Sequence, residues 1–147
     1  MKYVKPTKEL NYEFRSKFQS IVAEIERQHP EGTLELIGLE ICDTLIPHIC
    51  EYLQTKKLRF SMIKLVKNAI TDEGFKVLLS YLSTDTYTKV LNLTSNQITH
   101  KSFPHILQFI TLNNICKMIY LSNNKVSQMH LKKIQSNLDS KFMQVLL

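Results

Sequence analysis

Short segments in which apolar and polar residues alternate recur along this chain at a constant spacing. Three of them, residues 60–70, 88–98 and 116–126, align on an asparagine, and these asparagines are 28 residues apart. Alternation of this kind is typical of a half-buried strand. The asparagines are Asn68, Asn96 and Asn124, framed by Ile63, Leu65 and Ile70, by Leu91, Leu93 and Ile98, and by Ile119, Leu121 and Val126. The pattern therefore indicates repeated units rather than unrelated elements.

Apolar residues at helical spacing follow each of these segments, so every unit is predicted to hold one strand and one helix. The helical sets are Phe75, Leu78, Leu79 and Leu82, then Phe103, Ile106, Leu107 and Ile110, then Leu131, Ile134 and Leu138, with Thr71, Thr99 and Ser127 as N-cap candidates. A weaker copy precedes them at an offset of 29, with Leu39 in place of the asparagine. One strand and one helix cannot bury their apolar faces alone, but stacked units can, with parallel strands on one side and helices on the other.

This pattern resembles the leucine-rich repeat LxxLxLxxNxL in its ribonuclease-inhibitor-like form of 28 or 29 residues. The resemblance is carried by the three equally spaced asparagines and by residues 68–75, and it covers residues 33–147. It implies a short α/β solenoid of about four repeats plus a terminal strand, with a concave face of parallel strands and a convex face of helices. It also implies that each asparagine amide bonds backbone groups of its own and the neighbouring loop, which is a structural role.

The two ends of this stack are predicted to differ. Residues 1–32 are expected to form a capping helix that breaks at Pro30–Gly32, although a partner-binding amphipathic helix is the alternative. Thr7 is its N-cap candidate, and its apolar stripe is Leu10, Phe14, Phe18, Ile21, Val22 and Ile25. Residues 142–147 are expected to form a final strand with no polar cap beyond it. An apolar edge strand needs cover, so we expect either a partner subunit on this end or a tail that folds back.

Composition and charge limit the size class, the partner classes and the cellular compartment that fit this chain. The chain has 147 residues, the length of one domain, and a formal net charge of +6. Residues 91–147 hold six basic residues and one acidic residue, which fits an acidic protein, a nucleic-acid backbone or a solvated surface. No apolar run reaches membrane-spanning length, and no signal peptide is evident. With three cysteines, an odd number, the expected setting is intracellular and cytoplasmic, with reduced thiols; the resemblance also permits cytoskeletal or ciliary assemblies.

The residues that carry chemistry form no recognisable motif. Three glycines are too few for a Gly-rich phosphate loop, and the five histidines and three cysteines form neither HExxH nor CxxC. A nucleophile pair of Cys42 or Cys50 with His48 would lack an orienting acid. Asp72 and Glu73 fall in a helix first turn, where they complement the dipole. We therefore predict no catalytic, cofactor-binding or metal-binding residues, no cofactor, no small-molecule substrate, and a protein that is not an enzyme.

The residues that flank the inward-facing leucines are expected to form a surface for a protein partner. Methionine and tyrosine on an exposed sheet suit an adaptable contact. The predicted partner-binding residues are Met62, Lys64, Val66, Val90, Asn92, Met118, Tyr120, Val145 and Leu147. The sequence thus favours a non-catalytic protein–protein interaction module or a scaffold subunit of a larger intracellular assembly. The alternatives are a basic subunit of a ribonucleoprotein complex, which would contact RNA, and a regulator of a partner enzyme.

Overall fold

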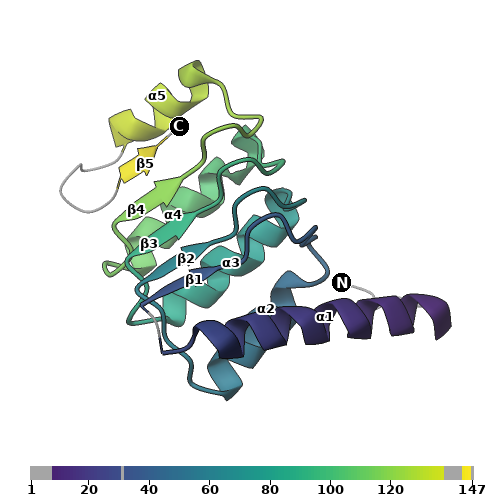
Figure 1. Cartoon of the computed structure of the whole chain (residues 1–147). Coiled ribbons are helices and arrows are strands. Elements are labelled where there is room, and N and C mark those ends of the chain that lie inside the picture. Colours follow the sequence, from purple (N-terminus) through teal and green to yellow (C-terminus); the bar gives the residue numbers. More distant parts are fainter. Residues whose placement is uncertain (1–7, 31, 138–143, 147) are drawn as a thin grey trace.

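A sheet of five parallel strands, in the order β1-β2-β3-β4-β5, runs through the molecule (Figure 1). The computed structural model describes residues 8–30, 32–137 and 144–146. The strands are β1 (Thr33–Glu35), β2 (Met62–Lys64), β3 (Val90–Asn92), β4 (Met118–Tyr120) and β5 (Gln144–Leu146). Thr33, Met62, Val90, Met118 and Gln144 lie side by side in register. The sequence period therefore corresponds to a step from one strand to the next.

Helices follow the strands and lie on one side of the sheet (Figure 1). They are α2 (Ile46–Thr55), α3 (Asp72–Thr84), α4 (Phe103–Leu112) and α5 (Gln128–Asn137), and a short 3-10 helix, η1 (His100–Ser102), leads into α4. A longer helix, α1 (Lys8–Gln28), precedes β1. The predicted α/β architecture with parallel strands is confirmed.

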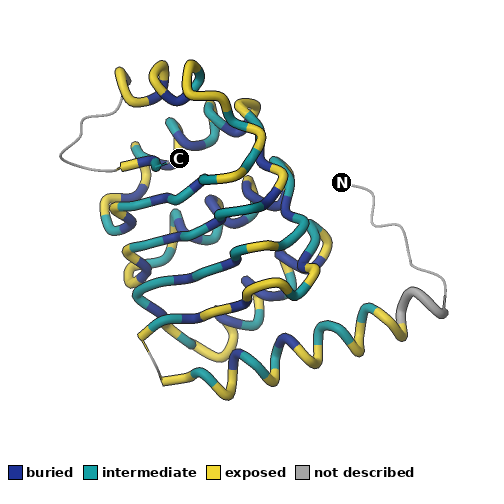
Figure 2. The backbone as a smooth tube through the Cα atoms, turned by 45° about the horizontal axis from the view of Figure 1, so that its top comes forward, coloured by how far each residue is buried: buried dark blue, intermediate teal, exposed yellow. Residues whose placement is uncertain are grey.

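The core lies between the sheet and the helices (Figure 2). The central residue of each strand points into it, and these side chains are at most 4% exposed: Leu34, Ile63, Leu91, Ile119 and Val145. Leu36, Leu65, Leu93 and Leu121 form a second inward row at 0–1% exposure. Phe75 and Leu82 of α3 and Ile106 and Phe109 of α4 meet these rows from the other side. The strict in–out alternation of the short strands produces this separation of faces.

The three repeated asparagines bond the backbone of successive units together. Asn96 is 7% exposed, its Oδ1 accepts from the N–H of Ile70 at 3.0 Å, and its Nδ2 donates to the carbonyls of Leu65 and Leu93 at 2.8 and 3.0 Å. Asn68 and Asn124 make equivalent bonds to their own loop and the preceding one. These amides satisfy backbone groups that no ladder partner reaches, so their role here is structural.

Carboxylates form a second connection between units. Asp72 Oδ1 accepts from the N–H of Thr99 at 2.9 Å, and Asp72 Oδ2 accepts from its hydroxyl at 2.6 Å. Asp43 bonds the N–H and hydroxyl of Thr71 in the same way. Thr71 is the N-cap residue of α3 as predicted, but its hydroxyl turns to Asp43 rather than to a helix N–H. Thr99 and Ser127 do accept from N–H groups of the turns that they precede.

The Asp72 carboxylate is expected to make the stability of the fold depend on pH in the acidic range. Partial burial opposes ionisation, but hydrogen bonds from Ser102 and Thr99 outweigh it and lower the pKa of Asp72. A lowered folded-state pKa contributes stability that is present above the unfolded pKa, about 4, and is lost as the pH falls through the folded value. Asp72→Asn should therefore be less stable than the native chain at neutral pH, and the difference should shrink below about pH 4. Urea unfolding across this range tests it.

The control for this prediction is Glu73→Gln in the same helical turn, since Glu73 is exposed. Its stability should differ from the native value by at most a few tenths of a kcal/mol. A pH-independent deficit in Asp72→Asn would contradict the prediction, because it would assign the effect to lost packing rather than to charge.

Helix α1 covers the β1 end of the core. Ile21 and Ile25 are 2% and 0% exposed, and Phe14 and Phe18 pack edge-on against His48 of α2 with ring centroids 4.9 and 5.9 Å apart. The predicted apolar stripe thus faces α2 and the first strand at these positions. The N-cap candidate Thr7 and the side chain of Leu10 lie outside the described residues. Of the predicted 142–147 strand, residues 144–146 form β5, and 142, 143 and 147 also lie outside the described residues.

Candidate functional site: the outward face of the sheet

The strand positions that alternate with the core residues form an outward face free of helices (Figure 1). Its first row is Thr33, Met62, Val90, Met118 and Gln144, and its second row is Glu35, Lys64, Asn92, Tyr120 and Leu146. A third row, just beyond the strands, holds Ile37, Val66, Thr94 and Ser122. Seven of the residues predicted to bind a partner lie on this face, all of them partly exposed: Met62, Lys64, Val66, Val90, Asn92, Met118 and Tyr120.

One predicted partner-binding residue lies elsewhere. Val145 is 0% exposed and pairs with Ile119 in the core row, so it is a core residue and not part of the outward face. Its place follows from the register with β4, which turns Gln144 and Leu146 outward instead. Leu147, the other predicted residue of this segment, lies outside the described residues.

Polar contacts hold part of the face in fixed orientations. The Lys64 ammonium lies 2.8 Å from the Glu35 carboxylate on the neighbouring strand. Asn92 Oδ1 accepts from the N–H and hydroxyl of Thr94 at 3.0 and 2.6 Å. Such exposed contacts contribute little to stability. The methionine and valine side chains beside them form the adaptable apolar part of the surface.

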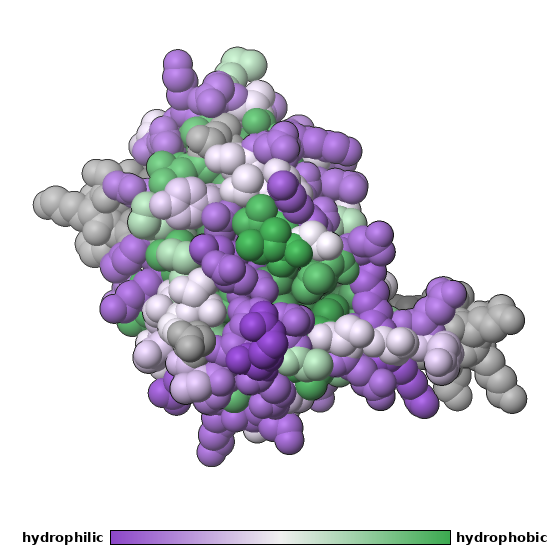
Figure 3. Space-filling model, viewed as in Figure 1, coloured by the Kyte–Doolittle hydropathy of each residue, from purple (hydrophilic) through white to green (hydrophobic). Residues whose placement is uncertain are grey.

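Figure 3 shows apolar side chains gathered in the middle of the molecule's surface, with hydrophilic side chains around them. The part-exposed apolar residues that the sheet turns outward are Ile37, Met62, Val66, Val90, Met118 and Leu146. Ile37 is 42% exposed, the most exposed large apolar side chain of the face. Ile37 and Val66 are adjacent, because the N–H of Gly38 donates to the carbonyl of Val66 at 2.9 Å.

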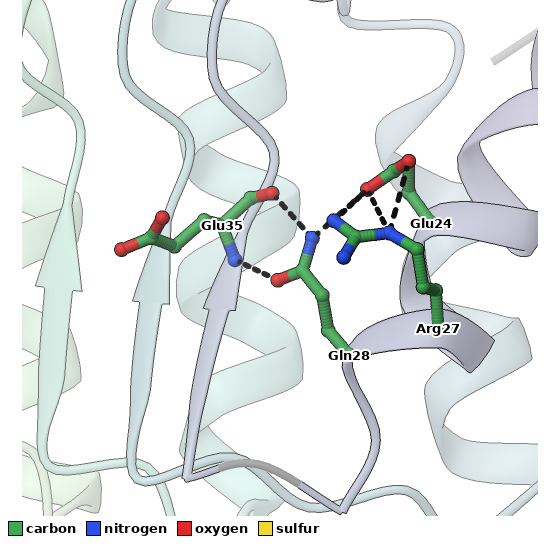
Figure 4. A network of polar contacts seen from close by, with 4 residues as sticks. All are labelled: Glu24, Arg27, Gln28 and Glu35. Atoms are coloured by element: carbon green, nitrogen blue, oxygen red, sulfur yellow. Dashed lines mark hydrogen bonds and ion pairs between the residues drawn. The ribbon is translucent and has the colours of Figure 1, made fainter.

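A cleft of about 530 Å³ opens between α1 and the first strand. Its α1 wall is Glu24, Arg27 and Gln28, and its other wall is formed by Gly32, Thr33, Glu35, Ile37 and Leu39. The Gln28 amide fixes these walls, since Nε2 donates to the Glu35 carbonyl at 2.8 Å and Oε1 accepts from the Glu35 N–H at 2.6 Å (Figure 4). The side chain thereby occupies the N–H and carbonyl that Glu35 would offer to another strand at this edge.

An ion pair between Arg27 and Glu24 fixes side chains on the α1 wall of this cleft. Arg27 donates to the Glu24 carboxylate with a shortest distance of 2.8 Å, and Gln28 Nε2 also reaches Glu24 at 3.2 Å (Figure 4). These contacts lower the pKa of Glu24, with the Arg27 hydrogen bond as the largest cause. Sequence reasoning missed Gln28 as part of the face. Its position in the last turn of a helix gave no signal of the strand atoms that it reaches.

The described residues contain no group of three His, Cys, Asp or Glu side chains placed to hold a metal ion. The side chains of the cysteine–histidine pair disfavoured on sequence grounds make other contacts: the Cys42 thiol lies 3.1 Å from the Thr44 hydroxyl, and the His48 ring packs on Phe14 and Phe18. Burial raises the pKa of the Cys50 thiol to about 12 and that of Cys116 to about 11, so neither is a thiolate at neutral pH.

The cysteines are therefore expected to differ in reactivity. Iodoacetamide at about pH 8 should modify Cys42, which is partly exposed, well before Cys50 and Cys116, which are 6% and 0% exposed. Peptide mass spectrometry after timed quenching measures the three rates. All three should react alike in a denaturant, which serves as the control, and rapid modification of Cys50 in the folded protein would contradict the assignment.

Among the described residues, no helix is both long and apolar enough to cross a bilayer. The fold and this face define an α/β protein with a parallel sheet open on one side. No protein-family model and no curated protein matches the chain. A solved structure titled "Leiomodin-1 Actin-Binding Site 2 (ABS2)" is similar to it, with a TM-score of 0.70, 17% identity, and coverage of 97% of this chain and 79% of that one. At this identity the likeness shows a shared fold.

Proposed function

We propose that this chain is a leucine-rich repeat protein of the ribonuclease-inhibitor-like subfamily that serves, without catalysis, as a protein-binding scaffold in a cytoskeletal assembly. In this proposal residues 1–32 form the cap and residues 33–147 form the solenoid. The single observation that carries the binding role is the outward face, where part-exposed methionine and valine side chains form a continuous row across β2, β3 and β4.

The backbone supports the assignment to leucine-rich repeats. A left-handed residue follows each of the first four strands at the same place, with φ between 54° and 65°: Gly38, Lys67, Ser95 and Asn123. Such conformations are uncommon for residues other than glycine, so their recurrence reflects one loop geometry used in every unit. The asparagines that bond successive units fit the same geometry.

The similar structure supports a cytoskeletal partner. Its title names an actin-binding site of leiomodin, and its fold extends over nearly all of this chain. Actin is therefore the first partner to test. The residues that would bind actin cannot be transferred at 17% identity, so they are proposed from the exposed face of this chain alone.

The test uses purified actin, both monomeric and filamentous. Binding to monomers is measured by titration and binding to filaments by cosedimentation. The double variant Met62→Glu/Met118→Glu places charges in the apolar row and should weaken binding by about tenfold or more. Leu112→Glu/Met129→Glu is the matched control, because these two residues are 62% and 68% exposed on the helices rather than on the sheet.

The outcomes separate clearly. Binding that the sheet variant loses and the control retains supports the proposal. Failure of the native chain to bind either form of actin would overturn the cytoskeletal assignment. Equal loss in both variants would overturn the assignment of binding to the sheet face.

A further inference from the structure

Residues 86–137 contain no aspartate or glutamate. This stretch supplies β3, η1, α4, β4 and α5, which is 52 of the 132 residues that the structure describes. It carries six lysines, all of them exposed: Lys89, Lys101, Lys117, Lys125, Lys132 and Lys133. Soluble proteins usually intersperse positively and negatively charged side chains over their surface. A long stretch with charged side chains of positive sign alone therefore indicates an electrostatic field that attracts negatively charged partners.

Two carboxylates that precede this stretch, Asp85 and Asp72, make internal contacts. Asp85 accepts from the N–H groups of Tyr87 and Thr88, each at 3.0 Å. Asp72 accepts from Thr99 and from the Ser102 hydroxyl, the latter at 2.5 Å. Both carboxylates thus brace loops of the fold, and Asp72 also attracts the Lys101 ammonium.

The lysines border the outward face of β3 and β4 at both ends of the strands. At the start, Lys89 and Lys117 immediately precede β3 and β4, and they are neighbours because the Lys89 carbonyl accepts from the N–H of Lys117 at 2.8 Å. Beyond the end of β4, the N–H of Lys125 donates to the Ile98 carbonyl at 2.8 Å, next to the Thr99–Lys101 turn. Between these two rims lie the part-exposed residues Val90, Asn92, Met118 and Tyr120.

An apolar centre within a charged rim is the usual anatomy of a protein interface. We propose that the outward face of β3 and β4 docks a partner protein whose surface is acidic, with Lys89 on one rim and Lys101 and Lys125 on the other facing its carboxylates. This inference rests on the proposed binding function of the sheet and specifies the chemistry of the partner.

The observations favour an acidic protein over a nucleic acid. No arginine follows Arg59 in the chain, although arginine is the side chain that best matches phosphate by paired hydrogen bonds. Among the described residues of this face Tyr120 is the single aromatic one, which leaves few platforms for stacked bases. Flexible lysines on two separated rims instead suit steering toward a broad field of carboxylates.

The experiment uses the full chain with two simple probes, poly-L-glutamate and polyuridylate RNA. Affinities are measured by titration at about 0.05 M and about 0.3 M salt, and backbone amide shifts locate the bound polymer. Lys89→Glu/Lys125→Glu reverses one lysine on each rim. Lys56→Glu/Lys76→Glu is the matched control, with the same charge change at exposed lysines of the α2–α3 region.

The expected result is that poly-L-glutamate shifts amides of β3 and β4, and that the rim variant binds it about tenfold more weakly than the control. Equal loss in the two variants, or shifts spread evenly over the helices, would overturn the inference. Tighter binding of polyuridylate at the same rims and salt would also overturn it, in favour of a nucleic-acid partner. Because actin plays no part in this experiment, its outcome is independent of the actin test.

Discussion

Asn96→Ala is expected to destabilise the protein by roughly 3 to 5 kcal/mol. The amide of Asn96 lies in the loop after β3, the middle strand of the sheet, and bonds three backbone groups, the N–H of Ile70 and the carbonyls of Leu65 and Leu93. Alanine removes the partners of the Ile70 N–H and the Leu65 carbonyl in a site that is 7% exposed, whereas the Leu93 carbonyl keeps its bond from Asn124 Nδ2. A buried group without a partner costs about 1 to 3 kcal/mol, which is why the sum is large.

Urea unfolding followed by circular dichroism measures this effect. Gln97→Ala, at the exposed neighbouring position, is the control and should change stability by less than about 0.5 kcal/mol. Asn96→Asp keeps the acceptor for Ile70 and replaces the donor with a charge, so it should be at least as destabilising as alanine at neutral pH. If Asn96→Ala unfolds at the native urea concentration, the asparagine connection contributes little.

The sheet, its strand order and the face of each strand were predictable because one physical cause governs them. Only inward apolar positions at Leu34, Ile63, Leu91 and Ile119 allow neighbouring units to share a core. The repeated period then sets the register without any knowledge of loop geometry. The prediction for Val145 was wrong because the terminal segment is short. The register of Val145 with Ile119 becomes evident only when that segment is aligned on the core row.

Contacts that depend on loop geometry were not predictable in this way. Asn113 is 8% exposed and closes the turn before β4, where Oδ1 accepts from the N–H groups of Ile115 and Cys116 and Nδ2 donates to the Leu82 carbonyl. Asp85, 28 residues earlier, accepts from N–H groups of the turn before β3. Asparagine and aspartate favour such turns, but the sequence alone did not show that these two are equivalent.

The candidate face was predicted in outline, and the part beside α1 was not. Alternation along the strands identified Met62, Val90 and Met118 as outward residues. The cleft depends on where a separate helix lies, which is set by contacts between residues distant in sequence, such as Gln28 with Glu35 and Lys17 with the Glu40 carbonyl. Long-range polar contacts of this kind leave no period in the chain.

Ile25→Ala is expected to cost about 2 to 5 kcal/mol and to loosen α1 from the first strand. Ile25 is 0% exposed and, with Ile21, forms the buried part of the helix that closes the β1 end of the core. Removal of its side chain leaves a cavity between α1 and the core that the neighbouring side chains can fill only in part. Urea unfolding gives the loss of stability, and hydrogen exchange at the Glu35 amide reports on the edge, because that N–H donates to Gln28 Oε1.

Two further variants distinguish packing from edge closure. Gln28→Ala should raise exchange at the Glu35 amide with a loss of only about 1 kcal/mol, because it removes hydrogen bonds and little buried apolar surface. Gln19→Ala, at an exposed position of α1, should change neither quantity appreciably. If Ile25→Ala destabilises the chain while the Glu35 amide stays protected, then Gln28 holds the edge of β1 independently of how the helix packs, and α1 contributes two separable functions to this end of the sheet.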